Sequence, residues 1–214
     1  MNKSSGCRLI ASIILIMSVS AVFPVVALAL PTATGWEATV AGGIQFISQA
    51  DMALPEAMGG VPLVASVAYR CARVWKVEVE FCDILPVEQS VDLTGIGSVD
   101  RKTPGILTYQ ASVLASLPLE QCRWSPYLAA GAGAVTFLSK DEADRLPRLT
   151  DAETMFALNF GLGTTYEVGQ HWAVRAEFRE LIAFPADDAQ GLSVNGSADP
   201  IWMPRGILGA AYRF

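Results

Sequence analysis

The chain has 214 residues, of which 52% are hydrophobic and 17% are charged, and its net charge at pH 7 is −6. This length fits a single domain. Nucleic acid is excluded as an expected partner, because phosphate binding needs clustered Lys and Arg and this chain has an acidic balance.

The first 29 residues have the pattern of a secretory signal peptide. Lys3 and Arg8 give a positive start, residues 9–26 form an apolar run, and Ala-Leu-Ala at residues 27–29 provides a cleavage site. We expect cleavage after this site, which leaves residues 30–214 as one domain. The net charge then changes from −6 to −8, because two positive charges and no negative ones are lost. An uncleaved membrane helix is the alternative, since a spanning helix needs ~20 apolar residues.

Eight segments of the remaining chain alternate apolar and polar residues with the two-residue period of a β-strand. Such a strand presents an apolar face to lipid and a polar face to a lumen, as in the barrels of the bacterial outer membrane. In chain order, the predicted strands are residues 36–47, 61–70, 75–81, 107–113, 127–137, 156–166, 172–179 and 206–214.

The third and seventh of these segments alternate most clearly, and a helical period does not fit them. Their apolar faces begin and end on aromatic residues, and we expect Trp75, Phe81, Trp172 and Phe178 to face lipid. The opposite faces carry Lys76, Glu78 and Glu80 in the third segment and Arg175, Glu177 and Arg179 in the seventh.

The connections between the segments alternate in length, which is typical of outer-membrane barrels with long outside loops and short periplasmic turns. We therefore predict an all-β fold: an eight-stranded antiparallel up-and-down transmembrane β-barrel in the cell outer membrane, with both termini periplasmic. The long connections are residues 48–60, 83–105, 140–151 and 183–203, and the short ones are residues 71–72, 117–124 and 168–170.

The charged faces of the third and seventh strands should meet inside the barrel. In a ring of eight strands these two lie four apart and face each other across the lumen. We predict an ion-pair network that closes the lumen, with Gly161 and Gly163 making room for arginine. Its members are Lys76, Glu78 and Glu80 on one wall and Arg175, Glu177 and Arg179 on the other.

The chain resembles the small eight-stranded outer-membrane barrels of the OmpA/OmpX type, the outer membrane protein beta-barrel domain group, over essentially the whole mature sequence. The resemblance implies that Tyr212 and Phe214 form the C-terminal signal read by the barrel assembly machinery. It also implies outer-membrane lipid and lipopolysaccharide as surroundings, and we expect a monomer. The residues that carry it are the cleavage site at 27–29, PYLAAGAG at 126–133, WAVRAEF at 172–178 and AYRF at 211–214.

An enzyme is the main competing class, because the lipid A deacylases are eight-stranded outer-membrane barrels with a similar layout. That family carries a His-x-Ser pair late in the seventh-strand region, where base and nucleophile meet. The comparable residues 178–182 contain neither His nor Ser, and the single histidine, His171, falls at a predicted turn. We therefore predict a non-enzymatic protein with an envelope-structural or surface-interaction role, whose extracellular ligand, if it has one, is not specified by its acidic outer loops.

A soluble lipocalin-like periplasmic carrier is a second alternative, because alternation alone does not reveal which face points inward. Such a carrier would place its apolar face around a ligand in the lumen. Aromatic residues at the strand ends, including Tyr212 and Phe214, are typical of the membrane interface and favour the transmembrane arrangement.

Three cysteines, Cys71, Cys82 and Cys122, belong to the mature chain. Cys71 and Cys122 both lie in or beside predicted periplasmic turns, so they are the candidate pair for one disulfide, with three unpaired thiols as the alternative. We expect no cofactor and no metal site, because the chain has neither a Cys-x-x-Cys pair nor a histidine cluster.

Overall fold

The computed structural model describes residues 35–49, 58–93, 97–102, 104–117, 123–138, 152–186 and 199–214. The expected signal peptide lies outside these residues. Within them the chain forms strands and no helix. The strands are β1 (Gly35–Gln49), β2 (Met58–Arg70), β3 (Trp75–Pro86), β4 (Glu88–Leu93), β5 (Gly97–Lys102), β6 (Ile106–Ser116), β7 (Trp124–Phe137), β8 (Glu153–Glu167), β9 (Trp172–Phe184) and β10 (Ile201–Arg213).

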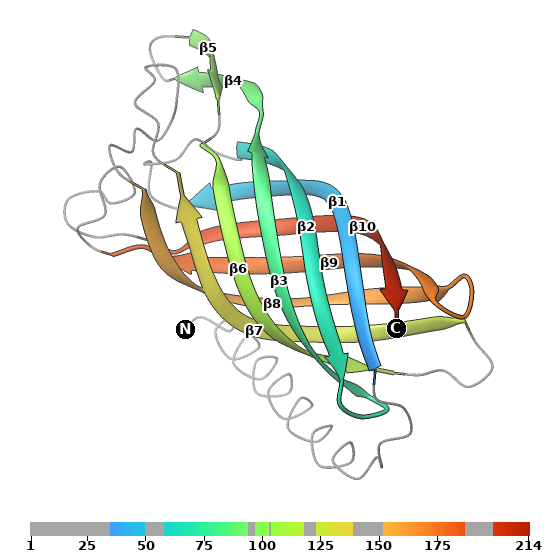
Figure 1. Cartoon of the computed structure of the whole chain (residues 1–214). Coiled ribbons are helices and arrows are strands. Elements are labelled where there is room, and N and C mark those ends of the chain that lie inside the picture. Colours follow the sequence, from blue (N-terminus) through green and yellow to red (C-terminus); the bar gives the residue numbers. More distant parts are fainter. Residues whose placement is uncertain are drawn as a thin grey trace, which may run out of the picture.

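Eight of these strands close into an antiparallel barrel in the order β1-β10-β9-β8-β7-β6-β3-β2 (Figure 1). The first and last strands complete the ring by pairing along their lengths, from Glu37 opposite Arg213 to Gln49 opposite Ile201. Every predicted strand coincides with a barrel strand, so the predicted eight-stranded antiparallel barrel is confirmed.

The observed strands extend beyond the predicted ones at both ends of the barrel, and most of the added residues lie at the end with the long connections. The segment 83–105, predicted as a long connection, contains the last residues of β3 and a separate hairpin of β4 and β5. Glu88 of this hairpin lies opposite Lys102, and Leu93 lies opposite Gly97. The sequence did not indicate this hairpin, because Val99 is the only apolar residue from 97 to 102 apart from glycine and that strand therefore gives no two-residue signal. Figure 1 shows the hairpin beyond the barrel, at the end opposite the C-terminus.

We call the two ends of the barrel the turn end and the loop end. At the turn end lie Gly35, Phe214 and the short connections at residues 71–74 and 168–171; the backbone N–H of Phe214 donates to the Trp36 carbonyl at 3.0 Å. The loop end carries the longer connections. Both ends of the described chain therefore share one end of the barrel.

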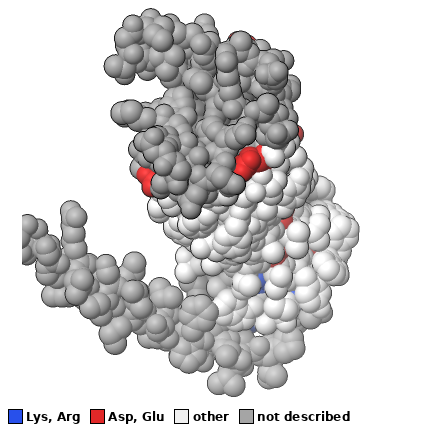
Figure 2. All heavy atoms as spheres, turned by 90° about the vertical axis from the view of Figure 1, so that its left-hand side faces the viewer, with Lys and Arg blue, Asp and Glu red and all other residues white. Residues whose placement is uncertain are grey.

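The apolar face of each strand points away from the lumen. Val79, Leu128 and Leu162 are 59–63% exposed on the outer wall, whereas Glu78 and Glu80 on either side of Val79 are buried. Figure 2 shows this wall as almost free of charge, with acidic side chains next to the loop end. A lipocalin-like arrangement, which needs the apolar face inside, is therefore wrong. No helix in the described part of the chain is long and apolar enough to cross a membrane.

Aromatic side chains form a belt around the turn end. The ring centroids of Trp36 and Tyr69 lie 4.9 Å apart, and those of Trp124 and Tyr166 lie 4.8 Å apart on neighbouring strands. Amphipathic rings of this kind gather where a barrel wall passes from hydrocarbon to headgroups. The belt therefore marks one membrane boundary on the outer wall.

Candidate functional site: a charged network in the barrel lumen

Six charged side chains meet in the middle of the lumen and balance one another, with three carboxylates facing three guanidinium groups. All six are at most 5% exposed. They come from three strands that do not all adjoin, so the network ties opposite walls together. The members are Glu78 and Glu80 on β3, Arg175, Glu177 and Arg179 on β9, and Arg205 on β10.

Glu78 makes the contacts that cross the lumen. Its carboxylate accepts from both Nη atoms of Arg175, at 3.0 Å for Nη2 and Oε1 and closer still for the other pair, and Oε1 also accepts from Nη2 of Arg179 at 3.1 Å. Its side chain is completely buried. Since charged hydrogen bonds of this kind are short and strong, Glu78 holds β3 against β9 from inside.

Glu177 and Glu80 complete the charge balance. Nε of Arg179 lies 2.8 Å from Oε1 of Glu177, and Glu177 also pairs with Arg175. Glu80 lies 2.7 Å from Nη2 of Arg205 and 3.5 Å from Nη1 of Arg179. Each of the three carboxylates therefore lies beside at least two guanidinium groups. With three negative and three positive side chains, the network has no net charge.

Neutral side chains surround the charged ones. The Tyr127 hydroxyl donates to Oε2 of Glu177 and accepts from Nε of Arg175, both at 2.7 Å. Ser66 donates to Glu78 at 3.2 Å from β2. A Cβ atom at Gly163 would lie 2.3 Å from the Tyr127 hydroxyl oxygen, so this glycine makes room for a tyrosine instead of the arginine that the sequence suggests.

Lys76 belongs to a different cluster, nearer the turn end. Its Nζ lies 2.8 Å from Oε1 and 3.0 Å from Oε2 of Glu37 on β1. The same carboxylate lies 2.8 Å from Nε of Arg213, whose Nη1 lies 2.6 Å from Glu167. The six residues predicted to form one network are thus divided, with five in the middle of the lumen and Lys76 in this second cluster.

Sequence reasoning missed Arg205, Tyr127, Glu37 and Arg213 as lumen residues. Arg205 lies just before the predicted start of the last strand, although it shares a face with Arg213, opposite to the face of Tyr212, and this parity would have placed it inside. Glu37 and Thr39 share the polar face of the first strand, so the two-residue period of the sequence could have placed Glu37 inside. Nothing in the local pattern distinguishes Tyr127 from the aromatic residues of the outer wall.

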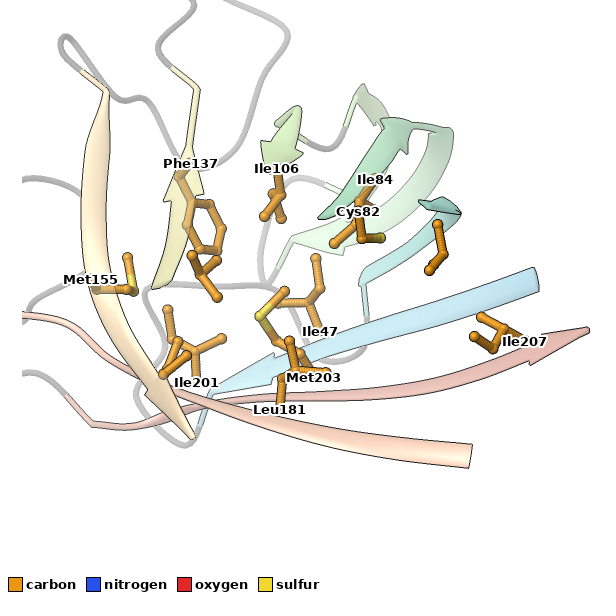
Figure 3. Packing of buried hydrophobic residues seen from close by; sticks show 14 of the residues in the cluster. Ile47, Cys82, Ile84, Ile106, Phe137, Met155, Leu181, Ile201, Met203 and Ile207 are labelled. Carbon is orange, nitrogen blue, oxygen red and sulfur yellow. The ribbon is translucent and has the colours of Figure 1, made fainter. Parts of the chain in front are cut away.

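The loop half of the lumen is filled by apolar side chains (Figure 3). A polar lumen was expected throughout, and this is wrong for the loop half. These residues come from all eight barrel strands and pack with almost no exposure, as in the core of a soluble protein. The largest of them are Ile47, Ile84, Ile106, Phe137, Met155, Leu181, Ile201, Met203 and Ile207.

The predicted lipid-facing aromatics lie on the outer wall. Phe81 is 43%, Trp172 is 56% and Phe178 is 51% exposed, and Trp75 is half-buried at the turn end. The Tyr212 ring packs against Trp172 at 5.0 Å and against Phe214 at 5.1 Å between centroids. These two terminal aromatics therefore belong to the same belt as the tryptophans.

The remaining candidate groups do not form a reactive site in the described part of the chain. His171 is exposed, and its Nδ1 lies 2.9 Å from the Arg213 carbonyl oxygen. The Cys71 thiol donates to the Trp75 carbonyl at 3.4 Å. Cys122 lies outside the described residues, so the disulfide stays a prediction. Among the described residues, no cluster of three His, Cys, Asp or Glu could hold a metal ion.

An apolar outer wall, an aromatic belt and a polar lumen centre together define a small transmembrane barrel of the outer-membrane type. The chain belongs to the family "Outer membrane protein beta-barrel domain", whose model matches residues 15–199. The protein therefore resides in the cell outer membrane, in contact with its lipids. No curated protein matches the chain.

Three solved structures show the same fold at low sequence identity. Neisserial surface protein A (NspA) has a TM-score of 0.58 and 14% identity over 85% of this chain and 99% of its own. The N-terminal β-barrel domain of OprF from Pseudomonas aeruginosa has a TM-score of 0.53 and 13% identity over 84% and 99%. Ail, the attachment invasion locus protein of Yersinia pestis, was solved with the heparin analogue sucrose octasulfate and has a TM-score of 0.50 and 15% identity over 84% and 99%.

Proposed function

We propose that this protein is a non-enzymatic outer-membrane barrel with a closed lumen, which serves the envelope as a structural or surface-interaction protein. One observation carries the proposal: the middle of the lumen is filled by a neutral ion-pair network and its loop half by an apolar cluster. An interior of eight strands is just wide enough for side chains, so little space remains for a solute. Its function then depends on the outer wall and the loops.

The absence of catalysis is supported by the chemistry of the seventh barrel strand. Phe178 of β9 faces outward and Arg179 is completely buried in the network, where a deacylase-like enzyme would need a base and a nucleophile. His171 lies at the turn end beside Tyr212 and has no serine or carboxylate among its described contacts. A lipid A hydrolase is the competing proposal.

We further propose that the turn end faces the periplasm, that residues 1–29 are removed, and that the barrel is a monomer. Short connections and both ends of the described chain share the turn end, as in periplasmic ends of such barrels. Tyr212 and Phe214 lie in the aromatic belt at this end, and we propose that they form the signal for the barrel assembly machinery.

The loops carry most of the net charge of the mature chain. The four segments between barrel strands at the loop end, residues 50–57, 87–104, 139–151 and 185–200, contain twelve acidic and five basic residues. A polysulfated sugar such as the sucrose octasulfate with which Ail was solved would be repelled by such loops. A partner that is cationic, or that is bridged by divalent cations, such as lipopolysaccharide, suits them better.

Complementation of a deletion strain tests the proposal. We expect uptake of a small hydrophilic solute, and the mass of lipid A, to be the same with and without the protein. Detergent resistance or surface binding should be lost on deletion and restored by the wild type. Increased solute uptake would show an open lumen, and a change in lipid A mass would show a hydrolase.

A loop variant separates the two proposed roles. Replacement of Asp187 and Asp188 by asparagine removes two loop charges and leaves the barrel strands unchanged. If the role is structural, this variant restores detergent resistance as well as the wild type does. If the loops make the functional contact, the variant reaches the membrane in equal amount and fails to restore binding.

A further inference from the structure

A small cavity opens at the turn end, apart from the central network. Its volume is about 140 Å³, and it is lined by residues of two kinds. Glu37, Arg70, Lys76 and Arg213 line it from the lumen side. Trp36 and Phe214 line it from the aromatic belt. The cavity therefore joins the inside of the barrel to the membrane boundary.

The charges around this cavity are not balanced. Three cationic side chains and one carboxylate side chain line it, and Glu167 lies outside the lining, 2.6 Å from Nη1 of Arg213. Glu37 is shared by Lys76 and Arg213, at 2.8 Å from each. No described carboxylate forms an ion pair with Arg70; among the charges that act on it from farther away, the guanidinium of Arg213 repels it most strongly, and Glu37 and Glu167 attract it. A second anionic group at this position would relieve that repulsion.

The aromatic rim indicates where such an anion would come from. Trp36 is 54% and Phe214 is 76% exposed on the outer wall, where lipid meets the barrel. Aromatic side chains of this kind sit at the level of the lipid headgroups. A phospholipid whose chains lie along the wall would have its phosphate within reach of the rim, and guanidinium groups bind phosphate with two parallel hydrogen bonds.

We propose that this cavity binds the phosphate of an anionic phospholipid, with Arg70 as its main ligand and Arg213 and Lys76 as supporting charges. The net positive lining favours a lipid with net negative charge over a zwitterionic one. Trp36 and Phe214 hold the glycerol end of the lipid against the wall. The site would fix the height of the barrel in the leaflet at the turn end.

Native mass spectrometry of the full-length folded protein in neutral detergent tests this site. The probes are phosphatidylglycerol, phosphatidylcholine with the same acyl chains, and inorganic phosphate. The variants are Arg70→Gln and, as a charge-matched control at the same end of the barrel, Arg123→Gln, whose side chain is exposed outside the cavity. Heat-modifiable migration in SDS confirms that each variant is folded.

We expect wild type and Arg123→Gln to bind phosphatidylglycerol about tenfold or more tightly than Arg70→Gln, as for the loss of a charged hydrogen bond. Phosphatidylcholine should bind more weakly to the wild type. Equal phosphatidylglycerol affinity in all three proteins would overturn the site. Arg70-dependent binding of inorganic phosphate without lipid binding would overturn the lipid assignment. If Arg70→Gln does not fold, Arg70→Lys, which keeps the charge and loses the planar fork, should weaken binding in the same direction.

Discussion

The loop half and the middle of the lumen are built from the same strands, yet apolar side chains fill the first and charged side chains fill the second. In the loop half, side chains such as Phe137 and Leu181 pack with no exposure and need no specific partner. In the middle, Glu78 is also completely buried, but it depends on Arg175 and Arg179. Side chains exclude solvent in both regions. The regions differ in how much stability is lost when one side chain is replaced.

This difference concerns cooperativity. An apolar side chain contributes contacts that its neighbours replace in part when it is truncated, so the damage stays local. A buried charge is stable only while its counter-charges are present, because the cost of desolvation is otherwise uncompensated. The neutral set of three carboxylates and three guanidinium groups should therefore behave as one unit, whereas the apolar cluster should behave as separate members.

Glu78→Gln should have the largest effect on the stability of the barrel. The change keeps the volume of the side chain and leaves Arg175 and Arg179 short of one negative charge in a buried site. We expect the free energy of unfolding to fall by about 3–5 kcal/mol, as for other buried ion pairs that lose one partner. Urea unfolding in lipid vesicles, followed by tryptophan fluorescence, measures it.

A double variant provides the control for this prediction. Glu78→Gln combined with Arg175→Gln restores the charge balance of the network, so it should recover a large part of the loss that Glu78→Gln causes alone. Additive losses from the two substitutions would contradict a network that acts as a unit. Additive losses would mean that the charged side chains in the middle of the lumen act separately, as the side chains of the apolar half do.

The face of each network residue was predictable from the sequence, and its partner only in part. A two-residue period fixes which side chains share a face, and ring position places β3 opposite β9. Period and ring position do not fix height along the barrel, at ~3.3 Å for each residue. Lys76 lies two residues before Glu78 on the same face, and this step brings it to Glu37 instead of the arginines of β9.

The apolar half was not predictable from alternation, and β9 shows why, because this strand is apolar on both faces there. Leu181 and Ala183 point inward while Ile182 and Phe184 point outward, so the run from 181 to 184 has no polar member. A continuous apolar run has no two-residue signal. The predicted seventh strand therefore ended at Arg179, the last residue of clear alternation.

Leu181→Ala should have the next largest effect and probes the apolar half. Leu181 has no exposure and lies within the apolar cluster, so truncation leaves a cavity. We expect a loss of about 2–5 kcal/mol in the free energy of unfolding, measured as for Glu78→Gln. The neighbouring Ile182→Ala is the matched control, since Ile182 faces outward, where lipid chains fill the space. Equal losses at the two positions would show that the loop half is not tightly packed.

Glu167→Gln should have the smallest effect, because it breaks an ion pair at the exposed edge of the second cluster. Glu167 lies 2.6 Å from Nη1 of Arg213, but its side chain is 44% exposed and Arg213 keeps Glu37 as a partner. We expect a loss of about 0–1 kcal/mol in the free energy of unfolding, as for exposed pairs.

The salt dependence of the loss distinguishes this pair from the network. Screening acts over ~10 Å at 0.1 M and ~3 Å at 1 M, so the small loss should vanish at high salt. The loss caused by Glu78→Gln should persist there, because a dry pair is screened far less. A Glu167→Gln loss as large and as salt-resistant as that of Glu78→Gln would show that the buried network extends to the turn end.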